Sequence, residues 1–388
     1  MKIILSLILI SVLYCGNKTQ TESSDSNKEI EQNKEQINDV RVKTENFKLY
    51  DFYSENKNID VIVEREFNLL SDHERVGQML VPAAGVYGKS EAEINKLIER
   101  GSIGGVLLLK GDKDEFMGYV NRFDETSVVN NKLPLIFSAD AEPSLINKKI
   151  SGLPEIQPTN SLKTNDEVKQ SADVISRILL QMGISQNYAP VVDLGINKAI
   201  IGNRSFGNDT ESIITLASEF IKTSQDIGII ATAKHFPGHG NVKGDSHKNV
   251  VYIDGEMDEI SIYESLIKSG VISIMVGHIA VKNNKNYNTS GVPATLSYNI
   301  VTDLLKKEMG FKGLVVTDAM NMGAVSKIKS ASFKAIEAGC DMILMPDNEE
   351  KIISSVLTRM EKDAEFKERI YDSCKKIIRA KVCLGLIQ

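Results

Sequence analysis

Eight short apolar runs divide the chain, and amphipathic helical patterns lie between them. Apolar runs bounded by glycine or proline are typical of strands buried on both faces, and their alternation with helices requires parallel pairing through right-handed crossovers. Eight such units predict an α/β fold, a (β/α)8 TIM barrel, rather than an open doubly wound sheet. The expected strands are residues 79–83, 105–109, 133–138, 188–194, 229–235, 272–278, 313–318 and 342–345.

Polar residues gather where these runs end. Active sites of TIM barrels lie at the carboxyl ends of the strands, whereas a random scatter would place polar residues at both ends. The sequence therefore predicts that side chains from several runs meet at one face. Those that end or follow the third to seventh runs are Asp140, Glu142, Asp193, Lys234, His235, His278 and Asp318.

The first fifteen residues have the layout of an export signal, with a lysine, an apolar stretch and then Cys15. The apolar stretch is too short to span a bilayer as a helix. Cys15 resembles the lipidated cysteine of bacterial lipoproteins, although Val12 and Tyr14 depart from the usual lipobox. We expect lipidation of Cys15, and a plain cleaved signal or an uncleaved anchor remains the alternative.

A polar segment follows the signal, rich in Asn, Lys, Glu, Gln and Ser with isolated apolar residues. Such a segment buries too little surface to offset the entropy of ordering, so residues 16–58 are expected to form a disordered tether. Residues 59–388 are expected to form the single barrel domain. The exported domain is thus predicted to be lipid-anchored to the cell envelope, at the periplasmic face or the cell surface.

Charge and motif content exclude several classes of protein. The net charge of −6 argues against a nucleic-acid partner, and the chain contains neither a P-loop nor a dinucleotide fingerprint. The cysteines outside the signal show no close pair and no zinc-ligand spacing. We expect them to be free and buried; they are Cys340, Cys374 and Cys383.

Three of the five histidines fall within residues 234–247. Zinc binding is one explanation, but Pro237 and Gly238 separate His235 from His239 and prevent the helix that would align both imidazoles. We therefore predict no metal here. Histidines that only hydrogen-bond a loop are a second explanation, and a catalytic segment is the third.

At this segment the chain resembles glycoside hydrolase family 3, in particular its single-domain β-N-acetylhexosaminidase branch. Several motifs occur in the family's order, which is more specific than any one motif alone. The matching segments are KHFPGHG at 234–240, DSH at 245–247, YAPVVD at 188–193, GNRSFG at 202–207, MVGH at 275–278 and VVTDAMNMGA at 315–324.

The resemblance implies retaining hydrolysis through a covalent glycosyl-enzyme intermediate. The family's nucleophile is the Asp of its T-D-x-x-x-M-G-A motif, which is Asp318 here. In this branch the D-S-H loop supplies the acid/base, which maps to His247 assisted by Asp245. An imidazole held by a carboxylate exchanges protons near neutral pH, as that role requires.

Sugar recognition in the family transfers to polar residues around the expected pocket. A structural role and a site role are both open for Asp193, and we prefer the structural one. Met320 and Met322 are expected to pack at the pocket wall. The expected substrate-binding residues are Asp140, Lys148, Arg204, Lys234, His235 and His278.

One segment departs from the family pattern. Where the family has D-x-E-G-G-R-V-x-R, residues 140–148 read DAEPSLINK. Asp140 and Glu142 remain, both glycines and the first arginine are absent, and Lys148 replaces the second arginine. A lysine keeps the charge but loses the planar two-pronged contact, which puts the exact sugar contacts in doubt.

These observations predict a retaining β-N-acetylhexosaminidase that removes terminal β-linked N-acetylglucosamine from cell-envelope glycans or peptidoglycan fragments. We expect a monomer attached to the membrane through its lipid anchor, with no cofactor. Phosphorolysis at the same site is an alternative, because a histidine acid/base does not repel phosphate. A non-catalytic sugar-binding surface lipoprotein is another. Substrate-assisted hydrolysis by paired carboxylates is disfavoured, since pairs such as Asp258-Glu259 fall in polar helical stretches.

Overall fold

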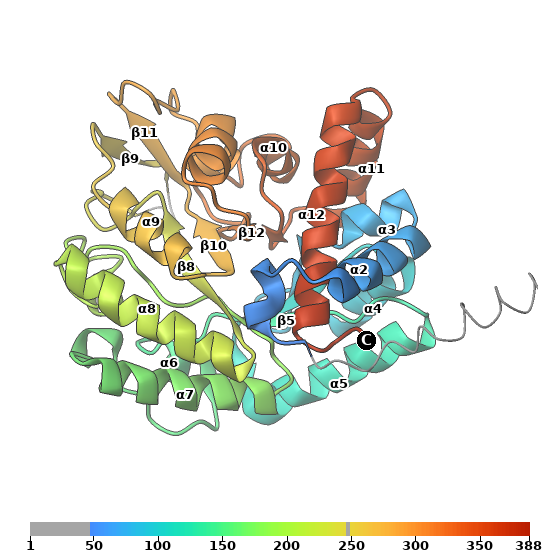
Figure 1. Ribbon diagram of the computed structural model, residues 1–388, viewed down its shortest axis with the longest axis horizontal. Coiled ribbons are helices and arrows are strands. Elements are labelled where there is room, and N and C mark those ends of the chain that lie inside the picture. The colour runs from blue at the N-terminus through green and yellow to red at the C-terminus, as the bar shows by residue number, and fades with distance from the viewer. Residues whose placement is uncertain (1–46, 246–248) are drawn as a thin grey trace, which may run out of the picture. The chain divides into compact units, whose positions relative to one another are not determined.

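The computed structural model describes residues 47–245 and 249–388 (Figure 1). The expected export signal, Cys15 and the tether up to residue 46 lie outside the described residues. The localisation that rests on them stays a prediction.

The chain is already part of the folded unit at Phe47, earlier than the expected boundary at residue 59. Phe47, Leu49 and Phe52 are buried in the core, and the carbonyl oxygen of Phe52 accepts a hydrogen bond of 2.6 Å from Nε of Arg379. These apolar residues stand among polar ones, and their partners come from the far end of the chain. Local composition therefore gave no sign that they are ordered.

Most strands are short, and all the pairings among them are parallel. The strands are β1 (Leu80–Val81), β2 (Ala83–Ala84), β3 (Gly105–Leu108), β4 (Gly111–Asp112), β5 (Ile136–Ala139), β6 (Ile150–Ser151), β7 (Gln186–Asn187), β8 (Ile230–Phe236), β9 (Val251–Asp254), β10 (Ser273–Val276), β11 (Ile279–Lys282), β12 (Leu314–Thr317) and β13 (Ile343–Leu344).

Helices alternate with the core strands and surround them (Figure 1). None of the helices within the described residues is long and apolar enough to cross a membrane. The helices are η1 (Leu49–Tyr53), α2 (Lys57–Leu69), α3 (Asp72–Gly77), α4 (Glu91–Arg100), α5 (Lys113–Val129), α6 (Ile146–Lys149), η2 (Thr159–Ser161), α7 (Asn165–Gln181), η3 (Gly202–Arg204), α8 (Thr210–Ile227), α9 (Ile260–Lys268), η4 (Ala294–Leu296), η5 (Asn299–Glu308), α10 (Ala331–Ala338), α11 (Glu349–Met360) and α12 (Ala364–Cys383).

The helix α4 illustrates why these segments are helical. Ser90 caps its first turn, with the Ser90 hydroxyl accepting from the Glu93 N–H and the Glu93 carboxylate accepting from the Ser90 N–H. Gly101 ends the helix at a φ of 69°, which glycine adopts without steric cost. Ile94 and Leu97 lie on its buried face, so the helix packs on the sheet.

Seven strands form one curled parallel sheet in the order β12-β10-β8-β7-β5-β3-β2. A further parallel pair joins β1 to β13, with Leu80 opposite Ile343. Strands β3, β5, β8, β10 and β12 are buried along their whole length. The prediction of a TIM-barrel-like α/β fold with parallel strands is confirmed. Cys340, Cys374 and Cys383 are free and buried, as expected.

The fourth expected strand, residues 188–194, is wrong in its position. Regular pairing covers Gln186 and Asn187, which contact β5 and β8. Pro190 has no N–H to donate to a ladder, and beyond it Val191 makes an isolated bridge. The apolar run after β7 is therefore the start of a buried loop rather than a strand.

A buried carboxylate ties helices to the amino ends of the strands. Asp341 accepts hydrogen bonds from Nζ of Lys306 at 2.9 Å, Nζ of Lys376 at 2.7 Å, Oγ of Ser373 at 2.7 Å and the N–H of Val315 at 2.9 Å. These donors hold the pKa of Asp341 well below its ordinary value, although burial alone would raise it. The carboxylate thus fastens α12 and η5 beneath β12 and β13.

Lys381 of α12 is fully buried and donates a hydrogen bond of 2.5 Å to Oε1 of Gln78. Burial disfavours the charged ammonium and lowers the pKa of Lys381 to about 7. Helix α12 therefore contacts Gln78, near the start of the domain, through a lysine whose charged form is disfavoured by burial.

Candidate active site

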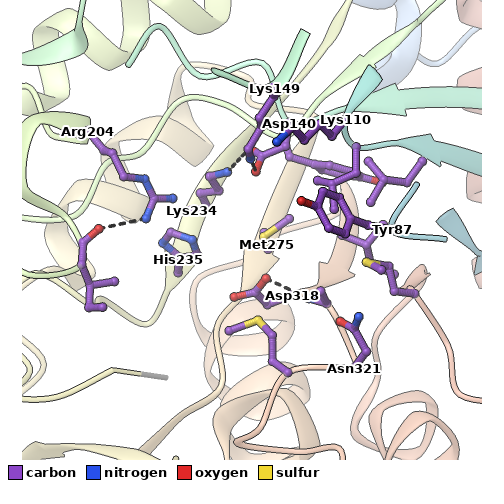
Figure 2. Close-up of a pocket in the computed structure, with 18 of the residues that line it drawn as sticks. Tyr87, Lys110, Asp140, Lys149, Arg204, Lys234, His235, Met275, Asp318 and Asn321 are labelled. Carbon is purple, nitrogen blue, oxygen red and sulfur yellow. Dashed lines mark hydrogen bonds and ion pairs between the residues drawn. The ribbon is translucent and has the colours of Figure 1, made fainter. Parts of the chain in front are cut away.

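A cavity of about 510 Å³ lies at the carboxyl ends of the strands (Figure 2). Its wall combines charged, aromatic and apolar side chains, as is usual for sites that bind small polar molecules. The structure brings together six residues that the sequence predicted for the site. They are Asp140, Lys148, Arg204, Lys234, His235 and Asp318.

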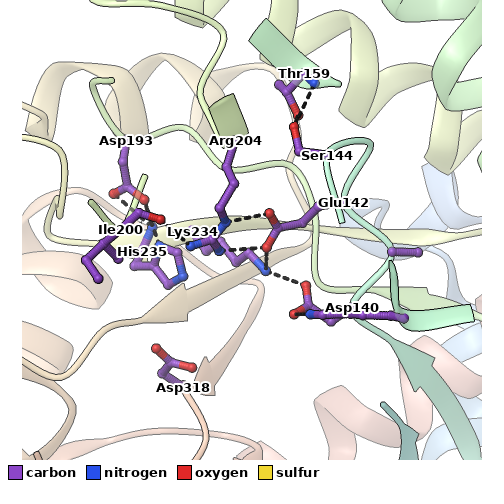
Figure 3. Close-up of polar contacts among 12 residues, drawn as sticks. Asp140, Glu142, Ser144, Thr159, Asp193, Ile200, Arg204, Lys234, His235 and Asp318 are labelled. Carbon is purple, nitrogen blue, oxygen red and sulfur yellow. Dashed lines mark hydrogen bonds and ion pairs between the residues drawn. The ribbon is translucent and has the colours of Figure 1, made fainter. Parts of the chain in front are cut away.

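Asp318 directly follows β12, and its carboxylate faces the imidazole of His235 across the cavity (Figure 3). Oδ1 of Asp318 accepts a hydrogen bond of 2.8 Å from the N–H of Ala319. Burial raises the pKa of Asp318, but His235, His278 and this N–H outweigh it, and the pKa lies below its ordinary value. Asp318 is therefore an ionised carboxylate at neutral pH, as a nucleophile must be.

Lys234 lies at the centre of an ion-pair network on the opposite wall (Figure 3). Its Nζ is 2.6 Å from Oδ1 of Asp140 and 2.6 Å from Oε1 of Glu142. The two carboxylates raise the pKa of Lys234 against the effect of burial, and the cation in turn lowers the pKa of both acids. All three groups are charged, and Lys234 and Asp140 present their charges to the cavity.

Arg204 joins this network through two parallel hydrogen bonds to Glu142, each of 2.7 Å. The Glu142 side chain is 1% exposed, and its carboxylate forms ion pairs with Arg204 and Lys234 rather than contacts with solvent. Ser144 holds the segment that carries Arg204, because its hydroxyl donates to the carbonyl oxygen of Asn203 at 2.6 Å. The arginine is thereby oriented before any ligand binds.

Lys149, and not Lys148, forms an ion pair with Asp140. Both lysines line the cavity and both lie in the short helix α6. Adjacent residues on a helix point about 100° apart, so a shift of one position exchanges which side chain reaches Asp140. The sequence comparison selected Lys148 for the missing arginine, and the structure adds Lys149 to the site.

Asp193 is fully buried and fixes two histidines from behind. Its Oδ2 is 2.7 Å from Nδ1 of His235, and its carboxylate also accepts the backbone N–H of His235 and that of His239 at 2.8 Å. Because a carboxylate accepts, Nδ1 of His235 carries the proton and Nε2 is the nitrogen left for the cavity. Both imidazoles line the cavity, while Asp193 supports them.

His278 is not among the residues that line the cavity, and its expected role in sugar binding stays a prediction. It is fully buried, with Nε2 3.0 Å from the carbonyl oxygen of Ala319 and Nδ1 2.7 Å from the hydroxyl of Thr295. The imidazole therefore supports the backbone next to Asp318 from behind. The strand-end pattern located it at the correct end of the sheet but could not show which way it points.

The expected acid/base loop is described in part. Asp245 is partly buried, its carbonyl oxygen accepts from the N–H of Asn249, and it is not among the residues that line the cavity. His247 lies outside the described residues. Their assignment as acid/base stays a prediction.

Several lining residues escaped the sequence analysis. Tyr87 and Lys110 form a cation–π contact, with the Nζ of Lys110 5.7 Å from the ring centroid. Asn321 and Met275 complete the wall nearest Asp318 (Figure 2). Asn321 follows Asp318 by three positions, and this spacing is the sequence signal that could have identified it. Of the two methionines expected at the wall, Met322 lines the cavity, whereas Met320 is buried in the core.

Within residues 47–245 and 249–388, no three His, Cys, Asp or Glu side chains are grouped so as to hold a metal ion. An ionised carboxylate faces a wall whose cations and carboxylates are suited to donate to and accept from hydroxyl groups.

Comparison with known proteins was made for both the sequence and the fold. The sequence model described as "Glycosyl hydrolase family 3 N terminal domain" matches residues 72–380. A "Beta-N-acetylglucosaminidase/beta-glucosidase" of Cellulomonas fimi is 27% identical over 336 residues, which cover 82% of this chain and 58% of that protein. A "Beta-hexosaminidase" of Vibrio cholerae is 27% identical over 291 residues, which cover 72% of this chain and 85% of that protein.

The fold matches solved structures. The β-N-acetylglucosaminidase of a Paenibacillus species, assigned to glycoside hydrolase family 3, superposes with a TM-score of 0.73 and 27% identity over 82% of this chain and 63% of that chain. The chain thus spans about three-fifths of the Cellulomonas and Paenibacillus proteins and most of the Vibrio protein.

Proposed function

The chain belongs to glycoside hydrolase family 3, and from that membership we propose that it is a retaining β-N-acetylhexosaminidase. The observation that carries the proposal is Asp318, an ionised carboxylate that lies in the cavity and faces the network of Lys234, Asp140 and Arg204. Three similar proteins are named β-N-acetylglucosaminidase or β-hexosaminidase. This supports terminal β-linked N-acetylglucosamine as the sugar that is removed.

In the proposed reaction the Asp318 carboxylate forms a bond to the anomeric carbon while the bond from that carbon to the glycosidic oxygen breaks. The departing oxygen takes a proton from the acid. Water then attacks the anomeric carbon, gives a proton to the same group acting as base, and frees Asp318. Asp140, Lys234 and Arg204 hold the sugar hydroxyls during both steps.

We propose His247, assisted by Asp245, as the acid/base. Support comes from the D-S-H motif, which follows β8 and the cavity-lining His239 along the chain. The cell-envelope location, with Cys15 lipidated and peptidoglycan fragments or other envelope glycans as substrates, is proposed from the sequence of the first fifteen residues.

We also infer that the curled sheet closes into an eight-stranded barrel. The inference is supported at the edge of the sheet, where Val316 of β12 bridges Met342 and β13 pairs with β1. The N–H of Gly104, which precedes β3, donates to the carbonyl oxygen of Leu80 at 3.1 Å. These contacts would join the two edges of the seven-stranded sheet through β1 and β13.

Phosphorolysis is the second candidate for the same site. Lys110 and Lys148 line the cavity beside Lys149, and cations favour entry of an anion. In that reaction phosphate, rather than water, attacks the anomeric carbon of the glycosyl-enzyme and the product is a sugar 1-phosphate.

The test is release of chromophore from an aryl β-N-acetylglucosaminide, with the glucoside and galactoside as controls and with phosphate present or absent. We expect turnover by the wild type, weak activity on the glucoside, and no turnover by Asp318→Ala. Detection of sugar 1-phosphate would favour phosphorolysis. Absence of turnover in a folded wild type, with or without phosphate, together with saturable glycan binding, would identify a sugar-binding protein instead.

A further inference from the structure

Glu259 is a buried carboxyl group in a stretch of otherwise exposed acids. It precedes α9, and 4% of its surface is exposed, whereas its neighbours Glu256 and Asp258 are exposed. The sequence placed the Asp258-Glu259 pair in a polar helical stretch, and that pattern did not indicate that Glu259 is buried. A carboxyl group is rarely buried without partners, so its contacts require an explanation.

The carboxyl group of Glu259 joins two loops that reach the cavity. Its Oε2 accepts a hydrogen bond of 3.1 Å from the N–H of Leu194, in the loop after β7. Its Oε1 accepts from the N–H of Gly240 at 2.9 Å and from that of Asn241 at 3.3 Å, in the loop after β8. One side chain therefore satisfies three backbone donors from two segments.

Each of these loops contributes to the support of His235. Leu194 follows Asp193, whose carboxylate holds the His235 ring, and Gly240 follows His239, whose N–H donates to the same carboxylate. Glu259 therefore binds the residue that directly follows Asp193 and the residue that directly follows His239. It does not line the cavity, so any effect on a bound sugar passes through these neighbours.

The packing around Glu259 leaves little room for displacement. A Cβ atom on Gly238 would lie 2.8 Å from Cβ and Cδ of Glu259, and one on Gly240 would lie 2.1 Å from the carbonyl oxygen of Leu194. The two loops therefore approach each other and Glu259 through backbone contacts that only glycine permits. A change in the Glu259 carboxyl group would move both loop backbones.

The charge of Glu259 is linked to that of Asp193. Burial and the negative charge of Asp193 raise the pKa of Glu259, whereas the three backbone N–H donors lower it. The Asp193 carboxylate that orients His235 therefore also acts on the Glu259 carboxyl group.

We propose that Glu259 is a positioning residue, which fixes the loops after β7 and β8 so that Asp193 holds the His235 imidazole toward the sugar. The inference rests on the proposed glycosidase activity for its kinetic consequences. Its structural consequence, the placement of His235, is independent of that activity.

The test compares Glu259→Gln, Glu259→Ala and the matched control Glu264→Gln, at an exposed residue of α9, the helix that Glu259 precedes. For each variant, steady-state kinetics on the aryl β-N-acetylglucosaminide and the melting temperature Tm are both measured, so that loss of activity can be separated from loss of folding. In Glu259→Gln an amide NH2 replaces one carboxyl oxygen and cannot accept the hydrogen bond from the backbone N–H that this oxygen binds. We therefore expect kcat to fall roughly ten- to a hundredfold, with a smaller change in KM. Glu264→Gln should stay within about twofold of the wild type.

A second readout is the NMR chemical shift of the histidine ring signals without substrate, assigned with His235→Gln. We expect the His235 ring signals to move in Glu259→Gln and to stay unchanged in Glu264→Gln. Wild-type kinetics in both Glu259 variants, or a loss of activity that only follows the folded fraction, would overturn the proposal. If the wild type shows no turnover, the proposed function fails. Unchanged His235 ring signals in Glu259→Gln would still overturn this inference.

Discussion

The carboxylate of Glu142 accepts both prongs of the Arg204 guanidinium at 2.7 Å, and it does so while 1% exposed. The same carboxylate contacts Nζ of Lys234. One buried carboxylate therefore forms ion pairs with two cations that lie at the wall of the cavity. Removing it would leave uncompensated charge in a poorly solvated place.

Glu142→Gln is expected to lower the free energy of unfolding by about 3 kcal/mol, since breaking a buried ion pair leaves a partner unpaired. Urea denaturation measures the change, with the exposed Glu155→Gln as control. A loss no larger than that of the control would show that solvent reaches Arg204 and Lys234.

Lys149→Met is expected to weaken sugar binding, because Asp140 loses one of the two cations that orient it. We expect KM to rise about tenfold, and Lys148→Met to have a smaller effect since its contact with Asp140 is not seen. Kinetics of the two variants side by side measure the difference. The reverse order of effects would restore the role expected for Lys148 from the sequence.

We expect the pH dependence of activity to report on Asp318, the proposed nucleophile. Its pKa lies below the ordinary value of an aspartate, so the limb of kcat/KM that belongs to this group is expected at acidic pH. His235→Gln removes the neighbour that lowers this pKa most, and the acidic limb should move to higher pH. The profile is measured over the range in which circular dichroism shows folded protein. An unmoved limb would mean that another group sets it.

Lys381→Met is expected to stabilise the protein. The pKa of Lys381 is about 7 in the folded chain against an ordinary 10.5, so the unfolded state binds more protons between these pH values. The wild-type free energy of unfolding should therefore rise with pH in that window. The variant should gain about 2–3 kcal/mol at pH 7, after loss of the contact with Gln78, and less toward pH 10.

Urea unfolding at several pH values measures this gain, with the exposed Lys351→Met as control. A gain that is constant with pH would show that packing of the methionine, and not the charge of Lys381, is responsible.

The sequence was most informative where local pattern and chemistry agree. Buried runs such as residues 229–235 became strands within one or two positions, because apolar runs between helical patterns have few alternatives. Asp318 and Lys234 were located because they end such strands. The family resemblance added Arg204, which ends the short helix η3 and has no periodic signal.

What the sequence could not predict depends on contacts between distant residues. Glu259 and Asp258 are adjacent acids of similar propensity, and only the approach of Leu194 and Gly240 distinguishes the buried one. The choice between Lys148 and Lys149 depends on the rotation of one short helix. The contacts of the His278 ring nitrogens with Thr295 and with the carbonyl oxygen of Ala319 likewise could not be read from its position at the end of a strand.

The hydrogen bond between Lys381 and Gln78 spans 303 positions, and that between Arg379 and Phe52 spans 327. A chain that leaves the ribosome from its amino terminus must therefore hold η1 and α2 without their partner until α12 has been synthesised. During translation the apolar faces of these first helices stay uncovered the longest. The core is thus completed late. We expect unfinished chains to aggregate most readily through the faces of η1 and α2 that α12 later covers.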